Sequence, residues 1–216
     1  MKLLHIDIET APHMAAVWGL WGQNVGLNQL IKPGYTLCFA AKWHGEKEVH
    51  FHSIADSTPK QMVKAAQRLL SEADAVCHYN GRKFDIPTLN KEFLLYGLAP
   101  PTPSKQIDLL TTARSRFRLA SNKLDYLAQQ LGLGRKEQHK GFTLWLECMA
   151  KDPAAWEVMK RYNVQDVLLL EKVYDRLKPW IKGHPNLSVE AGHVCPHCES
   201  DQLIRRGYQR TQTRRY

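Results

Sequence analysis

Residues 2–9 read KLLHIDIE, and this stretch decides how the chain is interpreted as a fold. Apolar and polar residues alternate in it, which is typical of a β-strand because successive side chains point to opposite faces. One face then carries apolar residues and the other polar ones: Leu4, Ile6 and Ile8 against His5, Asp7 and Glu9. Two carboxylates this close repel each other unless a cation lies between them, and Mg²⁺ prefers carboxylate oxygens. The alternative is an edge strand with a solvated polar face.

The composition is that of a globular protein with a basic surface. The 216 residues suffice for one sizeable α/β domain, or for a domain with a small appendage. The net charge of +9 favours a polyanionic partner such as nucleic acid, although an ordinary basic surface gives the same number. No signal peptide is recognisable, and no apolar stretch approaches the roughly 20 residues that a membrane helix needs. We therefore expect a cytoplasmic protein without membrane contact.

The remaining pattern predicts a mixed sheet with helices on its faces. A hairpin turn joins two expected strands, and helices alternate with strands after it. The expected strands cover 36–43, 47–53, 74–80 and 105–110, and the expected helices cover 59–73, a segment from about 85, 122–131, 141–150 and 154–177. Residues 182–193 carry Pro and Gly without helical periodicity. The sequence thus predicts an α/β domain over 1–182, a linker over 183–193 and a short C-terminal extension over 194–216.

Two further aspartates stand out in this pattern. Asp166 falls inside the apolar stripe of the last helix, where a carboxylate is costly unless it is paired or binds a metal. Tyr162 lies four residues earlier, so both side chains project from one side of the helix. The alternative places Asp166 at the rim of the stripe, paired with a lysine. Asp85 precedes a helix two residues before Pro87, where it could serve as an N-cap, as a ligand at the sheet edge, or as both.

Together these stretches resemble the three motifs of the DEDD superfamily of 3′–5′ exonucleases, which have the RNase H-like fold. The first motif is similar to DIET (7–10), the second to NGRKFD (80–85) and the third to YNVQD (162–166). The tyrosine of the third motif marks the subclass found in polymerase proofreading domains. The resemblance covers roughly residues 1–180. It implies an RNase H-like mixed sheet flanked by helices and a 3′–5′ exonuclease activity.

The resemblance also implies a role for each motif residue. Asp7, Glu9, Asp85 and Asp166 would bind two Mg²⁺ or Mn²⁺ ions. Asp7 would bridge the ions, Glu9 and Asp166 would complete the site of the ion that activates water, and Asp85 would serve the second ion. Tyr162 would orient the attacking water. Two such ions can activate water and stabilise the leaving oxygen in phosphodiester hydrolysis.

Other residues are candidates for contact with the nucleic acid. Asn80 and Lys83 lie in the second motif, before Asp85, and could contact the 3′ end or its phosphates. Trp18 and Trp21 could stack on a terminal base, with packing in the core as the favoured reading for Trp18. Lys140 and the arginines of 113–118 could contact the backbone or simply be solvated. We expect the substrate to be a nucleic acid with a free 3′ end, and we favour single-stranded DNA over RNA. Whether a polymerase or another replication protein is a partner is left open by the sequence. A non-catalytic nucleic-acid-binding module is the alternative class of function.

The C-terminal extension contains a CPHC sequence at residues 195–198. Cys195 and Cys198 have the spacing of one half of a zinc ribbon, and a second pair usually follows after about 15–20 residues. No Cys or His follows Cys198, so we expect only a partial ribbon. A four-ligand Zn²⁺ site of His193 and His197 together with Cys195 and Cys198 is a cramped alternative. The layout is similar to that of stand-alone phage and bacterial exonucleases with a ribbon-like tail. Its arginines would contact nucleic acid or form a basic end.

Overall fold

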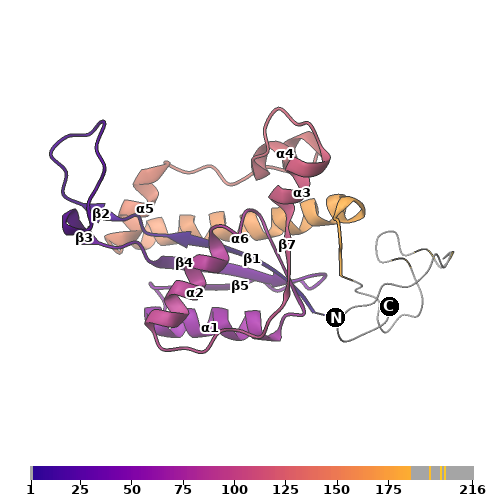
Figure 1. Cartoon of the computed structure of the whole chain (residues 1–216), viewed down its shortest axis with the longest axis horizontal. Helices are drawn as coiled ribbons and strands as arrows, with labels where there is room; N and C mark the ends of the chain where they lie inside the picture. The colour runs from indigo at the N-terminus through magenta and orange to yellow at the C-terminus, as the bar shows by residue number, and fades with distance from the viewer. Residues whose placement is uncertain (1, 186–194, 196–199, 201, 203–216) are drawn as a thin grey trace.

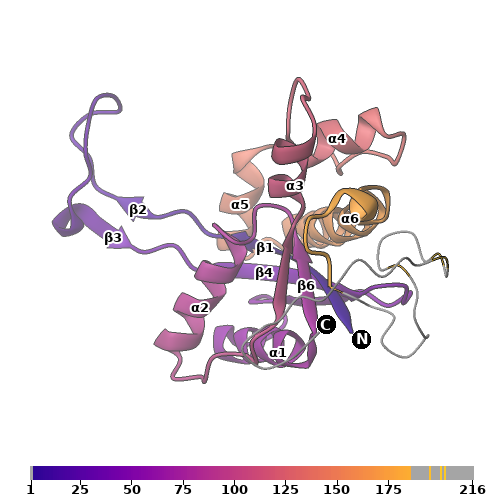
Figure 2. The same cartoon turned by 45° about the vertical axis from the view of Figure 1, so that its right-hand side comes forward.

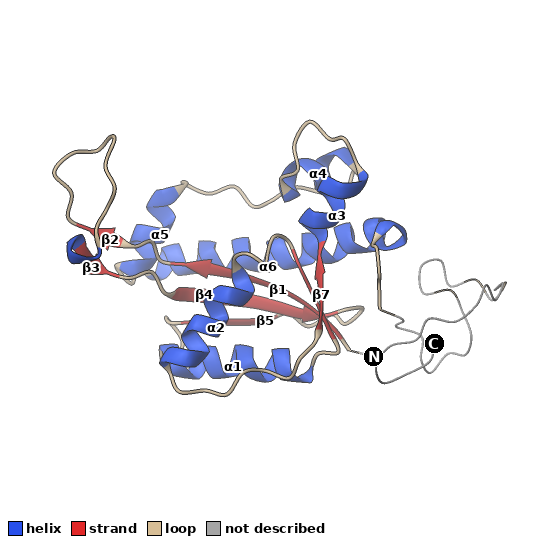
Figure 3. Ribbon diagram, viewed as in Figure 1, coloured by secondary structure: helices blue, strands red, loops and turns tan. Residues whose placement is uncertain are grey.

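The computed structural model describes residues 2–185, 195, 200 and 202 and contains a five-stranded mixed sheet (Figure 3). In spatial order the strands are β5 (His50–Ser53), β4 (Thr36–Trp43), β1 (Leu3–Thr10), β6 (Ala75–His78) and β7 (Lys105–Asp108). The first pairings, β5 with β4 and β4 with β1, are antiparallel, whereas β1–β6 and β6–β7 are parallel. The predicted mixed sheet flanked by helices is confirmed.

Helices cover both faces of this sheet (Figure 1). One face carries α1 (Pro59–Glu72) and α2 (Asp85–Leu95). The other face carries α6 (Pro153–Leu177), which packs on β1 and β4 and is joined by α3 (Leu109–Arg116), α4 (Leu124–Gln130) and α5 (Phe142–Met149). The short 3₁₀ helix Lys178–Trp180 follows α6. None of the helices in the described part of the chain has the length and apolar character needed to cross a membrane.

The alternation in β1 separates a hydrophobic core from the polar face, as the sequence predicts. The apolar side chains Leu4, Ile6 and Ile8 are buried in a core shared with α1 and α2. The polar face of β1 is turned toward α6. In the antiparallel register Asp7 lies opposite Ala40 and Glu9 lies opposite Cys38. These small neighbours leave room beside the two carboxylates for groups from α6.

The observed elements of the main sheet and its helices follow the expected ones closely, with the main differences at β5, β7 and α3. Strand β5 begins at His50, not at residue 47. Strand β7 ends at Asp108 because the Asp108 side chain caps the next helix, where it accepts hydrogen bonds from Leu110 N and Thr111 N. That helix, α3, was not expected from the sequence. Its mixed composition, with arginines and threonines, gives only a weak helical period.

A two-stranded arm projects from the body after β1 (Figure 2). It consists of β2 (Met14–Ala15), the 3₁₀ helix Leu27–Gln29 and β3 (Leu30–Lys32). The loop between the strands carries Trp18 and Trp21, which are 99% and 90% exposed. The expectation that Trp18 packs in the core is therefore wrong. The arm extends beyond the sheet, so no neighbouring layer is available to cover the indole.

The predicted linker and tail lie almost entirely outside the described residues, and so does Cys198. Within the described part, His184 is buried and its Nε2 lies 2.7 Å from the hydroxyl of Tyr174. The start of the expected linker thus packs against α6. Cys195 N donates a hydrogen bond to Ser200 O over 2.8 Å. Zinc binding by Cys195 and Cys198 stays a prediction.

Candidate active site

Three of the sequence-predicted acids meet between β1 and α6. One carboxylate oxygen from each of Asp7, Glu9 and Asp166 lies within 4.8 Å of the other two. Asp166 is only 1% exposed, because it belongs to the face of α6 that packs on the sheet. The alternative of a carboxylate at the rim of the helix is therefore wrong, although its pairing with a lysine is right. Three buried or half-buried acids at this distance form a site of high negative charge density.

Asn163 fixes the orientation of Asp7 in this cluster. It lies on α6, one residue after Tyr162, and is fully buried. Its Nδ2 donates a hydrogen bond to Asp7 Oδ2 over 2.8 Å and approaches the Asp7 carbonyl oxygen at 3.4 Å. Sequence analysis missed Asn163, although its place inside YNVQD on the core-facing side of the helix was a usable signal.

Lys136 brings a cation into the acidic cluster. Its Nζ lies 2.5 Å from Asp166 Oδ2 and donates to the hydroxyl of Tyr162 over 3.1 Å. The backbone of the residue is held in place because Lys136 N donates to Asp125 Oδ1 over 2.9 Å. Sequence analysis missed this residue, since it lies in an irregular segment between α4 and α5 where no periodicity indicates which way a side chain points.

Tyr162 is enclosed by side chains from the segment before α6. The rings of His139 and Trp145 meet it edge to face at centroid distances of 4.7 and 6.0 Å. Trp145 also donates a side-chain hydrogen bond to Glu9. The hydroxyl of Tyr162 is hydrogen-bonded to Asp166 as well as to Lys136. The tyrosine is thus held with its hydroxyl at the edge of the carboxylate cluster.

Asp85 lies beside the cluster but outside the group of three. It is the first residue of α2, with Phe84 in the N-cap position, so the expectation of an Asp85 cap is wrong. Its buried carboxylate instead accepts a hydrogen bond from Ile8 N over 3.1 Å, which ties the start of α2 to β1 between Asp7 and Glu9.

Burial raises the pKa values of all four carboxyl groups, and repulsion from the other acids of the site adds to this for Asp7 and Glu9. Burial and then the charge of Asp166 raise the pKa of Glu9 to about 8, and burial raises the pKa of Asp85 to about 7. The pKa of Asp7 lies well above its usual range because of burial, then Asp85 and Glu9. Burial also raises the pKa of Asp166, with Lys136 opposing it. These groups are poised to exchange protons for a cation.

The second motif forms a tight loop after β6. Asn80 has a left-handed backbone with φ of 69°, and its N–H donates to Asp108 Oδ1 over 3.0 Å. A Cβ at Gly81 would lie 2.4 Å from the ring of His78, so only glycine fits there. The predicted contact residue Lys83 is exposed on this loop. Asp108 therefore anchors the loop that leads to Asp85.

A cavity of about 640 Å³ opens beside Asp7. Basic side chains line it together with the acid: Arg114, Lys123 and Lys136. Tyr79 forms part of the wall, and its hydroxyl donates to Asn122 O over 2.6 Å. A volume of this size is typical of sites for small ligands or single building blocks of a polymer. The cavity joins cationic groups, suited to phosphates, with the Asp7 carboxylate of the cluster.

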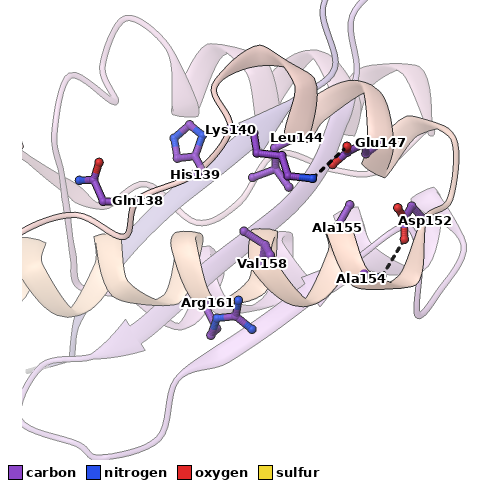
Figure 4. A pocket seen from close by; sticks show the side chains of 10 residues that line it. All are labelled: Gln138, His139, Lys140, Leu144, Glu147, Asp152, Ala154, Ala155, Val158 and Arg161. Carbon is purple, nitrogen blue, oxygen red and sulfur yellow. Dashed lines mark hydrogen bonds and ion pairs between the residues drawn. The ribbon is translucent and has the colours of Figure 1, made fainter.

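A second cavity, of about 450 Å³, lies between α5 and α6 (Figure 4). Lys140 lines this cavity and pairs with Glu147 at 3.4 Å. Asp152, which also lines it, caps the N-terminus of α6. Lys140 was a candidate for contact with nucleic acid. The structure places it on this second cavity and not among the residues that line the cavity at Asp7.

The residues of the cluster fit a divalent cation. All the ligands offered are carboxylate oxygens, which hard cations such as Mg²⁺ and Mn²⁺ prefer. Asp166 Oδ1 is buried and has no hydrogen-bond partner within the described structure. A buried carboxylate oxygen without a partner is costly. A cation bound between Asp7, Glu9 and Asp166 would satisfy this oxygen and relieve the repulsion.

The fold and this cluster define an α/β domain with a buried carboxylate centre, and comparison places it in a family. The model of the RNase_H_2 family, described as RNase_H superfamily, matches residues 26–178. The chain therefore belongs to the RNase H superfamily. The matched range includes Asp85 and Asp166 and begins after Asp7 and Glu9.

A solved structure with the same fold is the family B DNA polymerase from the hyperthermophilic archaeon Pyrobaculum calidifontis. It is similar with a TM-score of 0.61 at 16% sequence identity, over 82% of this chain and 24% of the polymerase. The chain thus spans about a quarter of the length of that polymerase. A search among curated proteins gives no match.

Proposed function

We propose that this chain is a metal-dependent 3′–5′ exonuclease that hydrolyses phosphodiester bonds at the 3′ end of single-stranded DNA. The observation that carries the proposal is the meeting of Asp7, Glu9 and Asp166 within 4.8 Å beside the hydroxyl of Tyr162. Membership of the RNase H superfamily supports nuclease activity in general. The 3′–5′ direction is supported by the resemblance of the three motifs to the tyrosine subclass of DEDD exonucleases.

The carboxylates of Asp7, Glu9 and Asp166 would hold Mg²⁺ or Mn²⁺, and Asp85 would add a ligand for a second ion. When bound, these ions supply Lewis-acid stabilisation and lower the pKa of a bound water. Asn163 keeps Asp7 in one orientation through its 2.8 Å hydrogen bond, so the ligand set is arranged before binding. Trp145 does the same for Glu9.

Tyr162 would position the attacking water by a hydrogen bond at its Oη. Burial and the charge of Asp166 raise the pKa of this phenol, so it stays protonated and able to donate. Lys136 donates to the same oxygen, so the phenolic proton is directed to Asp166 and would serve the water once a cation takes up that carboxylate. The ammonium also adds positive charge where charge on the phosphate develops.

The substrate strand would enter through the cavity beside Asp7. Arg114 and Lys123 line this cavity and are suited to the phosphates on the way to the carboxylates. Asn80 and Lys83, on the loop after β6, would contact the terminal nucleotide. Trp21 on the exposed arm would stack on an unpaired base farther along the strand.

A digest of matched DNA and RNA oligonucleotides, each labelled at the 5′ end, tests the proposal. We expect a ladder of products that keep the 5′ label in the presence of Mg²⁺ or Mn²⁺, and none with EDTA. Asp166→Asn should slow the reaction by about 100-fold or more, since one metal ligand loses its charge. Glu157→Gln, an exposed acid on the same helix, is the matched control and should leave the rate unchanged.

The other outcomes separate the alternatives. Faster digestion of RNA selects the exoribonuclease, which uses the same carboxylates because they bind phosphate and not the sugar. Release of the labelled 5′ nucleotide as the first product would contradict the direction. Binding of oligonucleotides without hydrolysis under every metal condition would select the non-catalytic binding module.

A further inference from the structure

A second cluster of ligand-type side chains lies on the same face of the sheet, at the other end of β1. It consists of His5 on β1, His44 directly after β4, and Glu171 on α6. His5 lies two residues before Asp7, and Glu171 lies five residues after Asp166, so the cluster is separated from the carboxylate centre along both elements. The three residues come from three segments that are far apart in the sequence.

The spacing of their ligand atoms matches a tetrahedral metal site. His5 Nε2 lies 3.2 Å from His44 Nδ1, and His44 Nδ1 lies 3.4 Å from Glu171 Oε1. All three ligand atoms lie within 4.8 Å of one another. Bonds of about 2.0–2.2 Å at the tetrahedral angle place neighbouring ligands roughly 3.3–3.6 Å apart. Two of the three separations are therefore close to those of a bound ion.

Surrounding groups orient these ligands as outer contacts do in metal sites. Glu171 Oε1 accepts a hydrogen bond from Gly45 N over 2.8 Å, and Glu171 Oε2 is 2.5 Å from the buried ammonium of Lys42. On the far side of its ring, His44 Nε2 lies 3.7 Å from Asp175 Oδ1. This arrangement leaves His44 Nδ1 and Glu171 Oε1 directed toward the point between the three ligand atoms, where an ion would lie.

The plain alternative is a histidine pair linked to an ion pair, held by one proton between His5 Nε2 and His44 Nδ1. His44 Nδ1 faces His5 Nε2 at 3.2 Å and Glu171 Oε1 at 3.4 Å, and a single proton can serve only one of these two contacts well. The buried His5 Nδ1 has no partner in the described structure with or without an ion, so it does not distinguish the two arrangements. A cation between the three ligand atoms would accept the lone pairs of all three at once.

We propose that His5, His44 and Glu171 form a second metal site, which binds a borderline cation such as Zn²⁺. Two imidazoles and one carboxylate suit Zn²⁺ better than Mg²⁺, which prefers oxygen ligands only. A fourth position is left for water. The ion would join β1, the end of β4 and α6, and would so fasten the helix that carries Asp166. The site is independent of the proposed nuclease function.

Zinc titration of the full chain tests this site. The reference protein, called the background, is the full chain with Cys195→Ser and Cys198→Ser, which remove two thiolates that could bind zinc. Excess Mg²⁺ is present in every titration to occupy the carboxylate centre. We expect one equivalent of Zn²⁺ to bind with an increase in melting temperature. His44→Ala and Glu171→Gln should each weaken binding by about tenfold or more and remove that increase. Co²⁺ in place of Zn²⁺ should show the absorption of a tetrahedral site.

The matched control is His50→Ala, which removes another partly exposed histidine on the neighbouring strand. It should bind zinc like the background. The proposal is overturned if the background takes up no Zn²⁺, or if His44→Ala and Glu171→Gln, shown by circular dichroism to be folded, bind it with unchanged affinity. Since Mg²⁺-dependent nuclease activity is not the readout, failure here leaves the proposed function untouched.

Discussion

The side-chain amide of Asn163 donates a hydrogen bond to Asp7 Oδ2 over 2.8 Å and so joins residues 156 positions apart in the sequence. It connects the long helix α6 directly to the central strand β1, at the carboxylate that would bridge two metal ions. Because both groups are within the protein layer between helix and sheet, the bond fixes where the carboxylate points before any ion arrives.

Asn163→Ala should weaken metal binding at the carboxylate centre. The change leaves Asp7 without its buried donor, and loss of a contact that orients a metal ligand costs about 10–100-fold in affinity. It should also lower the free energy of unfolding by about 1–3 kcal/mol. Calorimetric titration with Mn²⁺ measures the first effect and urea unfolding the second. Val164→Ala, on the next position of α6, is the control; equal Mn²⁺ affinity in both variants would contradict the assigned role of Asn163.

Lys136→Met should destabilise the metal-free protein and slow the nuclease. The ammonium pairs with the buried Asp166 at 2.5 Å, and removing it leaves that carboxylate without its cationic partner. Because Lys136 is itself partly exposed to water, we expect a loss of only about 1–3 kcal/mol in unfolding free energy. Saturating Mn²⁺ should restore more of the melting temperature in this variant than in the parent chain.

The control for Lys136→Met is Lys140→Met. Lys140 is exposed and pairs with Glu147 at 3.4 Å, so its loss should change stability by about 0.5 kcal/mol or less. Equal effects of the two substitutions on stability and on the rate of DNA hydrolysis would show that the contact of Lys136 with Asp166 and Tyr162 has no special role.

The stability of the metal-free protein should fall as the pH rises. Burial and then Asp166 raise the pKa of Glu9 from 4.5 to about 8, so between these values the folded state binds more protons than the unfolded one. The unfolding free energy then decreases with pH across this window, and the raised pKa values of Asp7 and Asp85 act in the same direction. Melting curves in EDTA across this range measure the trend.

Mg²⁺ should reverse this trend, since it replaces protons at the carboxylates. The gain in melting temperature on adding Mg²⁺ should therefore be larger at about pH 8 than at about pH 5. Asp7→Asn should raise the melting temperature in EDTA at the higher pH and remove most of the response to Mg²⁺. A gain that is the same at both pH values would contradict a site built on raised carboxyl pKa values.

Gly81→Ala should disrupt the loop that precedes Asp85. The new Cβ would lie 2.4 Å from the ring of His78, and the ring is buried and cannot move away freely. We expect a loss of about 1–3 kcal/mol in stability together with reduced activity, because overpacking moves the backbone. Gly19→Ala on the exposed arm, where only a flexible glutamine side chain is near, should change stability little. Thermal melts and the oligonucleotide digest measure both.

The sheet and the acids could be predicted because they leave periodic signals. Alternation in 2–9 placed Asp7 and Glu9 on one face of a strand, and the helical stripe placed Asp166 on the buried side of α6. Both patterns depend on local geometry alone. Where a charged residue interrupts such a pattern at an apolar position, the sequence itself marks a site.

The groups that complete the site leave no such signal. Lys136 reaches Asp166 from an irregular segment 30 positions earlier, so nothing local fixes its direction. The arm that carries Trp18 was missed because two very short strands give too few residues to show an alternation. The second cluster needs the register of β1 against β4, which brings His44 next to His5 and appears only in the folded sheet.

The double substitution Trp18→Ala and Trp21→Ala should weaken binding of single-stranded DNA without changing stability. Both indoles are exposed by 90% or more, so their removal exposes no core and should shift the melting temperature little. If they stack on bases, each contributes about 1–3 kcal/mol, and the affinity should fall by at least about tenfold. Fluorescence anisotropy with a catalytically inactive Asp166→Asn background measures binding without hydrolysis. Leu20→Ala, on the same loop and also exposed, separates stacking from a general apolar contact: a loss equal to that of the tryptophans would indicate that the arm meets an apolar partner and not the bases of a strand.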